Sequence, residues 1–120
     1  MDWIGLHFNK MKVICTPLTS NATNLLDLDA CPDSLLESIS LNQEEYEKLV
    51  TSGALAAINS SLGKIIDDYE DEVINTIEAL NKTLTILENH LTSENASVMK
   101  KLIYLNTLAI KNGTGLFFFF

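Results

Sequence analysis

The sequence NGTGLFFFF at residues 112–120 decides the fold class that the rest of the chain must accommodate. Asn112-Gly113 is typical of a helix C-terminus, because glycine readily adopts the left-handed conformation that closes a helix. The apolar run that follows is too short for a separate helix, and its four phenylalanines would place two rings on each face of a strand. We therefore predict a strand over 116–120 with both faces covered, unless one face is an interface.

The N-terminal region shows the two-residue alternation of strands. Apolar side chains alternate along residues 3–8, and residues 11–16 alternate in the same way. Asn9-Lys10 supplies a turn between the two segments. We expect this hairpin to share one sheet with the strand over 116–120.

The middle of the chain has the periodicity of helices. From 62 to 91, apolar residues recur every three or four positions, which predicts one long amphipathic helix of about eight turns. These positions are Leu62, Ile66, Tyr69, Val73, Ile77, Leu80, Leu84, Leu87 and Leu91. Such a stripe fits either packing within a bundle or a coiled-coil seam, which would make a homodimer through the long helix.

Two further helices are predicted on either side of the long one. Asn42 and Glu45 form a capping pair that would open a helix over 43–59, and a second helix is expected over 95–111. Residues 17–33 are rich in turn-forming residues and are expected to form a loop. At the end of that stretch, Pro32 would lie in the first turn of a short helix that includes Leu35, Leu36 and Ile39.

These elements together predict an α+β fold. A small sheet from the N-terminal hairpin and the C-terminal strand would pack with three to four helices in one domain over 1–120. No apolar run approaches the roughly 18–20 residues that span a bilayer, so no membrane partner is expected. The N-terminus lacks the basic start and apolar stretch of a signal peptide, which favours a cytoplasmic protein.

The charge of the chain is acidic and unevenly distributed. The net charge is −8, and residues 27–78 hold 13 of the 16 acidic residues but only two of the eight lysines. The chain contains no arginine, the residue best suited to bidentate phosphate contacts, so we expect no nucleic-acid binding. An acidic surface repels phosphates and attracts basic partners.

No arrangement of residues in the sequence predicts an enzyme. His7 and His90 have no Cys or acidic neighbour at metal-ligand spacing, and there is no phosphate-binding loop or nucleophile motif. Cys15 and Cys31 are interpreted as free thiols in a reducing compartment, with a single bridge as the alternative. We therefore expect no catalysis, no metal and no cofactor.

The acidic face of the predicted long helix is the one feature that points to a function. At 100° per residue, Asp67, Asp71 and Glu78 would cluster on the side opposite Val73. Residues 65–81 contain no lysine, whereas a face that serves only solubility mixes both signs of charge, although plain solvation remains the alternative. Ile86 would be an apolar anchor beside the charges. The candidate partner-binding residues are Asp67, Asp68, Asp71, Glu72, Glu78 and Ile86.

The chain resembles the small acidic immunity proteins that bacteria encode beside polymorphic or contact-dependent growth-inhibition toxins. The shared traits are length, acidity, the absence of a catalytic motif, and an ending in which a helix, Asn-Gly and a short apolar strand follow one another over residues 109–117. The resemblance implies a protein that binds and neutralises a cognate toxin, often a basic nuclease.

Two other classes account for the same features. A phage or viral decoy that inhibits a nucleic-acid-binding protein would be equally acidic, and a helical adaptor would dimerise through residues 62–91. A neighbouring toxin gene would favour the immunity protein, and a phage operon would favour the decoy. A dimer without a basic ligand would favour the adaptor.

Overall fold

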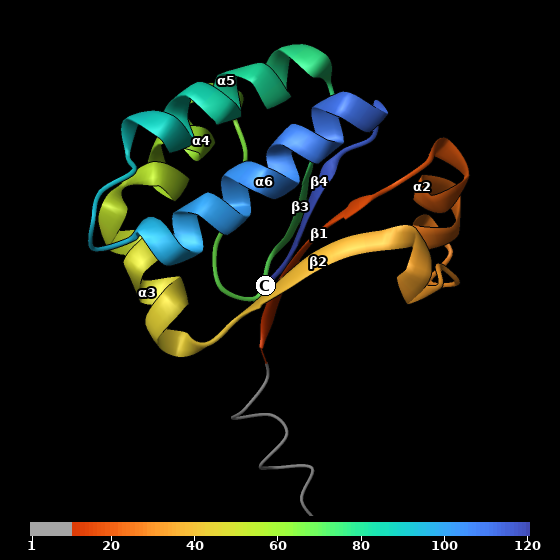
Figure 1. The fold of residues 1–120 in the computed structure, drawn as a ribbon, viewed down its shortest axis with the longest axis horizontal. Coiled ribbons are helices and arrows are strands. Elements are labelled where there is room, and N and C mark those ends of the chain that lie inside the picture. Colours follow the sequence, from red (N-terminus) through yellow and green to blue (C-terminus); the bar gives the residue numbers. More distant parts are fainter. Residues whose placement is uncertain (1–10) are drawn as a thin grey trace, which may run out of the picture.

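The computed structural model describes residues 11–120, which form an α+β fold, as predicted, built on a four-stranded sheet. The elements are labelled as in Figure 1. In chain order they are β1 (Lys12–Pro17), α2 (Ser20–Asp27), the 3-10 turn η1 (Asp33–Leu35), β2 (Leu36–Leu41), α3 (Gln43–Ser52), α4 (Ala54–Leu62), β3 (Asp71–Ile74), α5 (Ile77–Asn89), α6 (Ala96–Asn112) and β4 (Leu116–Phe119).

The sheet has the strand order β2-β1-β4-β3, and every neighbouring pair is antiparallel. β1 therefore lies between β2 and the C-terminal strand β4, with Ile14 opposite Phe118. This confirms that residues 11–16 and 116–120 share one sheet. The predicted strand over 3–8 lies outside the described residues. In Figure 1, α6 crosses one face of the sheet, α5 packs on α6, and α2 lies at the end of β1.

The two faces of β4 confirm that the phenylalanines divide two and two. Phe118 and Phe120 point into the core, where their rings meet edge to face at 5.7 Å between centroids. Phe117 and Phe119 lie half-buried on the opposite face and stack at 6.2 Å. Because α6 covers only the inner face, the two pairs of rings have different surroundings.

The prediction of one long helix over 62–91 is wrong. Helix α4 ends at Gly63, which has φ +65°, and the chain then forms β3 before α5 begins behind its N-cap Thr76. The strand interrupts the helix because residues 70–74 complete the edge of the sheet beside β4. The coiled-coil seam, and the homodimer proposed through it, therefore has no continuous helix to follow.

Two shorter predictions also need correction. The helix over 43–59 divides at Gly53, whose φ of +83° ends α3, although the Asn42 capping box with Glu45 is confirmed. Residues 17–33 were expected to be a loop but contain α2. The short helix expected to include Leu36 and Ile39 is instead the strand β2, because this segment satisfies its backbone by pairing with β1.

Helix α6 and its C-cap Gly113 agree with the sequence prediction. Its buried residues form one core cluster with the inner face of the sheet and with α3, α4 and α5. Within residues 11–120, no helix is both long and apolar enough to cross a bilayer.

Candidate functional site

The most acidic stretch of the chain connects α4 to β3. We call residues 64–72, Lys64-Ile65-Ile66-Asp67-Asp68-Tyr69-Glu70-Asp71-Glu72, the acidic segment. It lies in a loop with a turn at residues 67–70 and in the start of a strand, not on a helix face. Five of its nine side chains are carboxylates, so its conformation decides how that charge is presented.

Asn59 holds the middle of the acidic segment against α4. Its side-chain Nδ2 donates to the carbonyl of Ile66 at 3.1 Å, and the Ile66 amide donates back to Oδ1 at 2.8 Å. Ile66 itself is buried in the core. A backbone group that is removed from water needs a hydrogen-bond partner. Asn59 supplies partners for both the amide and the carbonyl of Ile66, so the Ile66 side chain can be buried between charged residues.

Glu72, the last residue of the segment, bonds back to its first residues. One of its carboxylate oxygens accepts from the Ile65 amide at 2.9 Å, and the other lies 3.9 Å from the ammonium of Lys64. Glu72 is half-buried. Its charge therefore serves the local fold of the segment and is partly compensated there.

Lys12 of β1 holds the acidic segment at Asp68. Its ammonium forms an ion pair with Asp68 and lies 4.6 Å from the ring centroid of Tyr46 and 5.7 Å from that of Phe120. Only 15% of the Lys12 side chain is exposed. The cation–π contacts and the ion pair both stabilise this position of the ammonium. Lys12 therefore links the acidic segment to the central strand β1.

The carboxylates of the segment also act on Tyr46, at the start of α3. Burial, followed by the negative charges of Asp68 and Asp67, raises the pKa of the Tyr46 phenol. A neighbouring negative charge disfavours the phenolate, so the hydroxyl stays protonated and available as a donor. Lys12 pairs with Asp68 and lies over the Tyr46 ring, so the acidic segment and the start of α3 meet at this lysine.

Tyr69 projects from the segment into solvent. The residue is 91% exposed, whereas the sequence pattern placed it in the buried stripe of a helix. It has a left-handed backbone with φ +63°, and its amide donates to the Phe120 carbonyl at 3.1 Å, extending the pairing of β3 with β4. Ile65 in the same segment is 62% exposed.

The predicted partner-binding residues have two different fates in the fold. Asp67, Asp68, Asp71 and Glu72 come together in the acidic segment. Glu78 does not join them, because it lies in the first turn of α5, beyond the far end of β3.

Ile86 is half-buried and packs against the core, so it is not an exposed anchor. The most exposed large side chain beside the charges is Tyr69, which the sequence analysis missed. Its position within the run DDYEDE was the available signal, because a ring surrounded by charges on both sides rarely belongs to a core.

Part of the charge is compensated within the fold. Among the described residues, the ion pairs are Lys12 with Asp68, Lys64 with Glu72, and Lys101 with Glu45. The exposed carboxylates of the segment that form no ion pair within residues 11–120 are Asp67, Glu70 and Asp71. We call these three residues the acidic patch.

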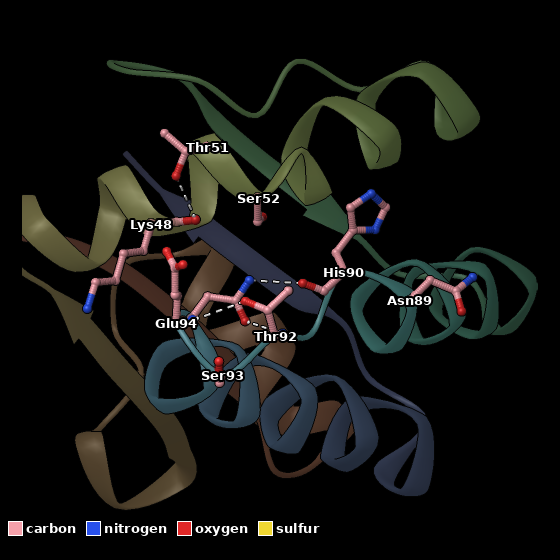
Figure 2. A pocket seen from close by; sticks show the side chains of 9 residues that line it. Lys48, Thr51, Ser52, Asn89, His90, Thr92, Ser93 and Glu94 are labelled. Carbon is pink, nitrogen blue, oxygen red and sulfur yellow. Dashed lines mark hydrogen bonds between the residues drawn. The ribbon is translucent and has the colours of Figure 1, made fainter.

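A separate polar hollow of about 460 Å³ lies between α3 and the turn after α5 (Figure 2). Its polar groups largely close the end of α5: the Asn95 side chain donates to the His90 carbonyl at 2.9 Å and accepts from the Thr92 amide at 2.9 Å. The His90 ring nitrogen Nδ1 lies 2.7 Å from the Ile86 carbonyl. These contacts give the hollow a structural role at the turn between α5 and α6.

The thiols and the acidic groups do not form a reactive or metal-binding cluster in the described part of the chain. Burial, and then the nearby Cys31, raises the pKa of the Cys15 thiol to about 11, which keeps it protonated at neutral pH. Both cysteines are free. Within residues 11–120, no three His, Cys, Asp or Glu side chains come together as a set of metal ligands.

The fold and the site define a small α+β protein that presents a fixed cluster of exposed carboxylates around an exposed aromatic ring. No family model and no curated protein matches the sequence. Among solved structures, the fold is similar to that of the Neisseria DNA mimic protein DMP12. The TM-score is 0.65 at 15% sequence identity, and the match covers 91% of this chain and 99% of that one.

Proposed function

We propose that this protein is an acidic decoy, which binds the nucleic-acid-binding surface of a basic protein in place of nucleic acid. The acidic patch supports this proposal most directly, because its carboxylates face solvent and form no ion pair within residues 11–120. The structural similarity to a DNA mimic protein, which extends over nearly the whole chain, supports the same function.

The way the acidic segment is held agrees with this function. A decoy must keep like charges in fixed positions although they repel one another, and a segment that is already ordered loses less entropy when it binds. Asn59, Glu72 and Lys12 each hold a different part of the segment. The charges can therefore meet a partner without a folding step.

The toxin-immunity interpretation is a special case of this proposal. A basic nuclease toxin is a nucleic-acid-binding protein, so an immunity protein that covers its active site would use the same patch. A phage or viral inhibitor would use it as well. We further propose that the protein acts by binding alone, without a cofactor, in the cytoplasm, where its two cysteines would stay reduced.

The proposal is tested by capturing the partner and then changing the patch. Proteins from the native host bind to the immobilised chain, duplex DNA is added as a competitor, and the released proteins are identified by mass spectrometry. We expect DNA to release basic nucleic-acid-binding proteins. Capture that duplex DNA does not disturb would argue against a shared binding surface.

The patch is then neutralised without a change in size. The variant Asp67→Asn, Glu70→Gln, Asp71→Asn removes three charges and should weaken the affinity for the captured partner by at least about tenfold at low salt, with a smaller effect at high salt, because exposed charges are screened over about 8–10 Å. Circular dichroism checks the fold.

A matched control separates the patch from total charge. The variant Glu78→Gln, Glu88→Gln, Glu94→Gln changes the net charge equally, at exposed positions of α5 and the turn that follows it. It should keep most of the affinity. Equal losses in the two variants would mean that net charge alone attracts the partner, and no loss in either would remove the acidic patch from the interface.

A further inference from the structure

We infer that Tyr69 is the side chain on which a guanidinium group of the partner stacks, so that the partner contacts an aromatic ring bordered by carboxylates. The inference deepens the proposed function and rests on it. It assigns a specific role to one residue of the acidic segment and a specific chemistry to the group that meets it.

The exposure of Tyr69 is the first observation. A tyrosine usually buries most of its ring, as Tyr46 does here, yet Tyr69 is 91% exposed. Its backbone is nevertheless fixed, because its amide donates to the Phe120 carbonyl at 3.1 Å and the Phe120 amide donates to the Glu70 carbonyl at 3.3 Å. A large ring held in water on an ordered backbone is a typical anchor of a protein interface.

The cation beside the ring is the second observation. The Lys12 ammonium lies 5.8 Å from the centroid of Tyr69, within the range of a cation–π contact. The fold therefore already places a positive charge next to this ring, and that charge is compensated by Asp68. Among residues 11–120, no other cation lies over this ring, and its exposed part can meet a second cation from outside.

The surrounding charges favour such a cation. Asp67 lies two residues before Tyr69, and Glu70 and Asp71 follow it directly. These three exposed carboxylates form no ion pair among the described residues. A cation that stacks on the ring would find carboxylate acceptors beside it, which is a more favourable environment than either feature alone.

The partner chemistry follows from how proteins hold nucleic acids. Arginine side chains stack their planar guanidinium groups on exposed bases and bond to phosphate oxygens with the same fork. For such a protein, the flat ring of Tyr69 would take the place of a nucleic-acid base. The carboxylate oxygens of the acidic patch would take the place of the phosphate oxygens. Lysine has a compact ammonium and gains less from the flat face.

The test uses two peptides as probes. The isotopically labelled full chain is titrated at low salt with hexa-arginine and with hexa-lysine, and amide shifts report the affinity. Tyr69→Leu removes the ring, Tyr69→Phe keeps it, and Tyr69→Trp enlarges it. All three variants retain a side chain at the left-handed position, so backbone strain is similar in each. Tyr104→Leu on α6, where Tyr104 is 54% exposed, is the control for loss of an exposed tyrosine.

We expect Tyr69→Leu to weaken hexa-arginine binding about three- to tenfold, which is the range of an exposed to partly desolvated cation–π contact. The effect on hexa-lysine should be smaller. Tyr69→Phe and Tyr104→Leu should bind as the wild type does, and Tyr69→Trp should bind at least as tightly. A gain in the Trp variant cannot come from damage to the fold.

Two results would overturn the inference. One is wild-type affinity for hexa-arginine in Tyr69→Leu, and the other is weaker binding by Tyr69→Trp than by Tyr69→Leu. The neutral triple variant of the acidic patch separates this failure from failure of the proposed function. If the neutral triple variant still loses affinity for hexa-arginine, the acidic patch binds cations without Tyr69 and only this inference fails. If the triple variant binds hexa-arginine as the wild type does, both proposals fail.

Discussion

Replacement of Asn59 by alanine tests whether the acidic segment is held as the structure indicates. The side chain makes two hydrogen bonds to Ile66, at 3.1 Å to its carbonyl and 2.8 Å from its amide. Alanine removes both partners at once, and the buried Ile66 side chain prevents the backbone from turning fully toward water. The substitution leaves α4 intact, because alanine is the best helix former.

The size of the effect follows from those two bonds. Each intramolecular hydrogen bond contributes about 1 kcal/mol, and the higher helix propensity of alanine returns about 0.5 kcal/mol. We expect a loss of about 1.5–2 kcal/mol in the free energy of unfolding. For a domain of this length the melting temperature changes by about 4 °C per kcal/mol, so it should fall by about 6–8 °C.

The assay combines thermal unfolding, followed by circular dichroism, with hydrogen exchange at the Ile66 amide, which should exchange faster in the variant. Asn81→Ala is the matched control, because Asn81 is exposed on α5 and its side chain makes no hydrogen bond to the described residues. An unchanged melting temperature together with unchanged exchange at Ile66 would refute the role given to Asn59.

Two further predictions concern the core and the thiols. Leu80→Ala should lower the free energy of unfolding by about 2–5 kcal/mol, because Leu80 is buried in the core, and an unchanged urea midpoint would contradict this. At pH 8 a thiol with a pKa of about 11 is only about 0.1% thiolate, so Cys15 should react slowly with a disulfide reagent until the pH approaches 11. Half-buried Cys31 should react first; a fast reaction that persists in Cys31→Ser would show that Cys15 is accessible.

The parts of the fold that sequence analysis predicted correctly have local causes. The capping box at Asn42 and the left-handed Gly113 each depend on a few neighbouring residues, so the pattern and the structure agree there. The strand over 116–120 was also predictable, because four phenylalanines need two covered faces. Its partner β1 followed from the alternation of residues 11–16.

The prediction of one long helix was wrong because the apolar periodicity was given more weight than two local signals, Gly63 and Thr76. Val73 lies four residues from Tyr69 on one side and four from Ile77 on the other, so this strand residue continues the helical spacing by coincidence. Gly63 and Thr76 marked the real ends, since one has the left-handed conformation and the other caps α5 through its hydroxyl, which accepts from the Ala79 amide at 3.2 Å. The pairing that makes β3 a strand comes from β4, more than forty residues further along the chain.

The same error explains which candidate residues stayed together. Asp67, Asp68 and Asp71 are close in sequence, so they stay in one segment whether or not it is helical. Glu78 depended on the helical repeat, and a strand advances about 3.3 Å per residue, so β3 carries Glu78 away from the others. Lys12 was not predictable as a member of the site, because only the sheet brings β1 beside the acidic segment.

The arrangement around the acidic segment is difficult to explain by solubility alone. Charges that only keep a protein in solution gain entropy from mobile side chains and a mobile backbone. Here the paired hydrogen bonds of half-buried Asn59, a half-buried glutamate and a lysine among aromatic rings fix a segment whose outward side is acidic and aromatic. Ordering a solvent-facing loop costs conformational entropy, and burying Ile66 alone would not require the further contacts that Glu72 and Lys12 make with the segment. The fixed conformation of the acidic segment has a function if a partner needs these charges in fixed positions. The proposed decoy function therefore accounts for more of the structure than solubility does.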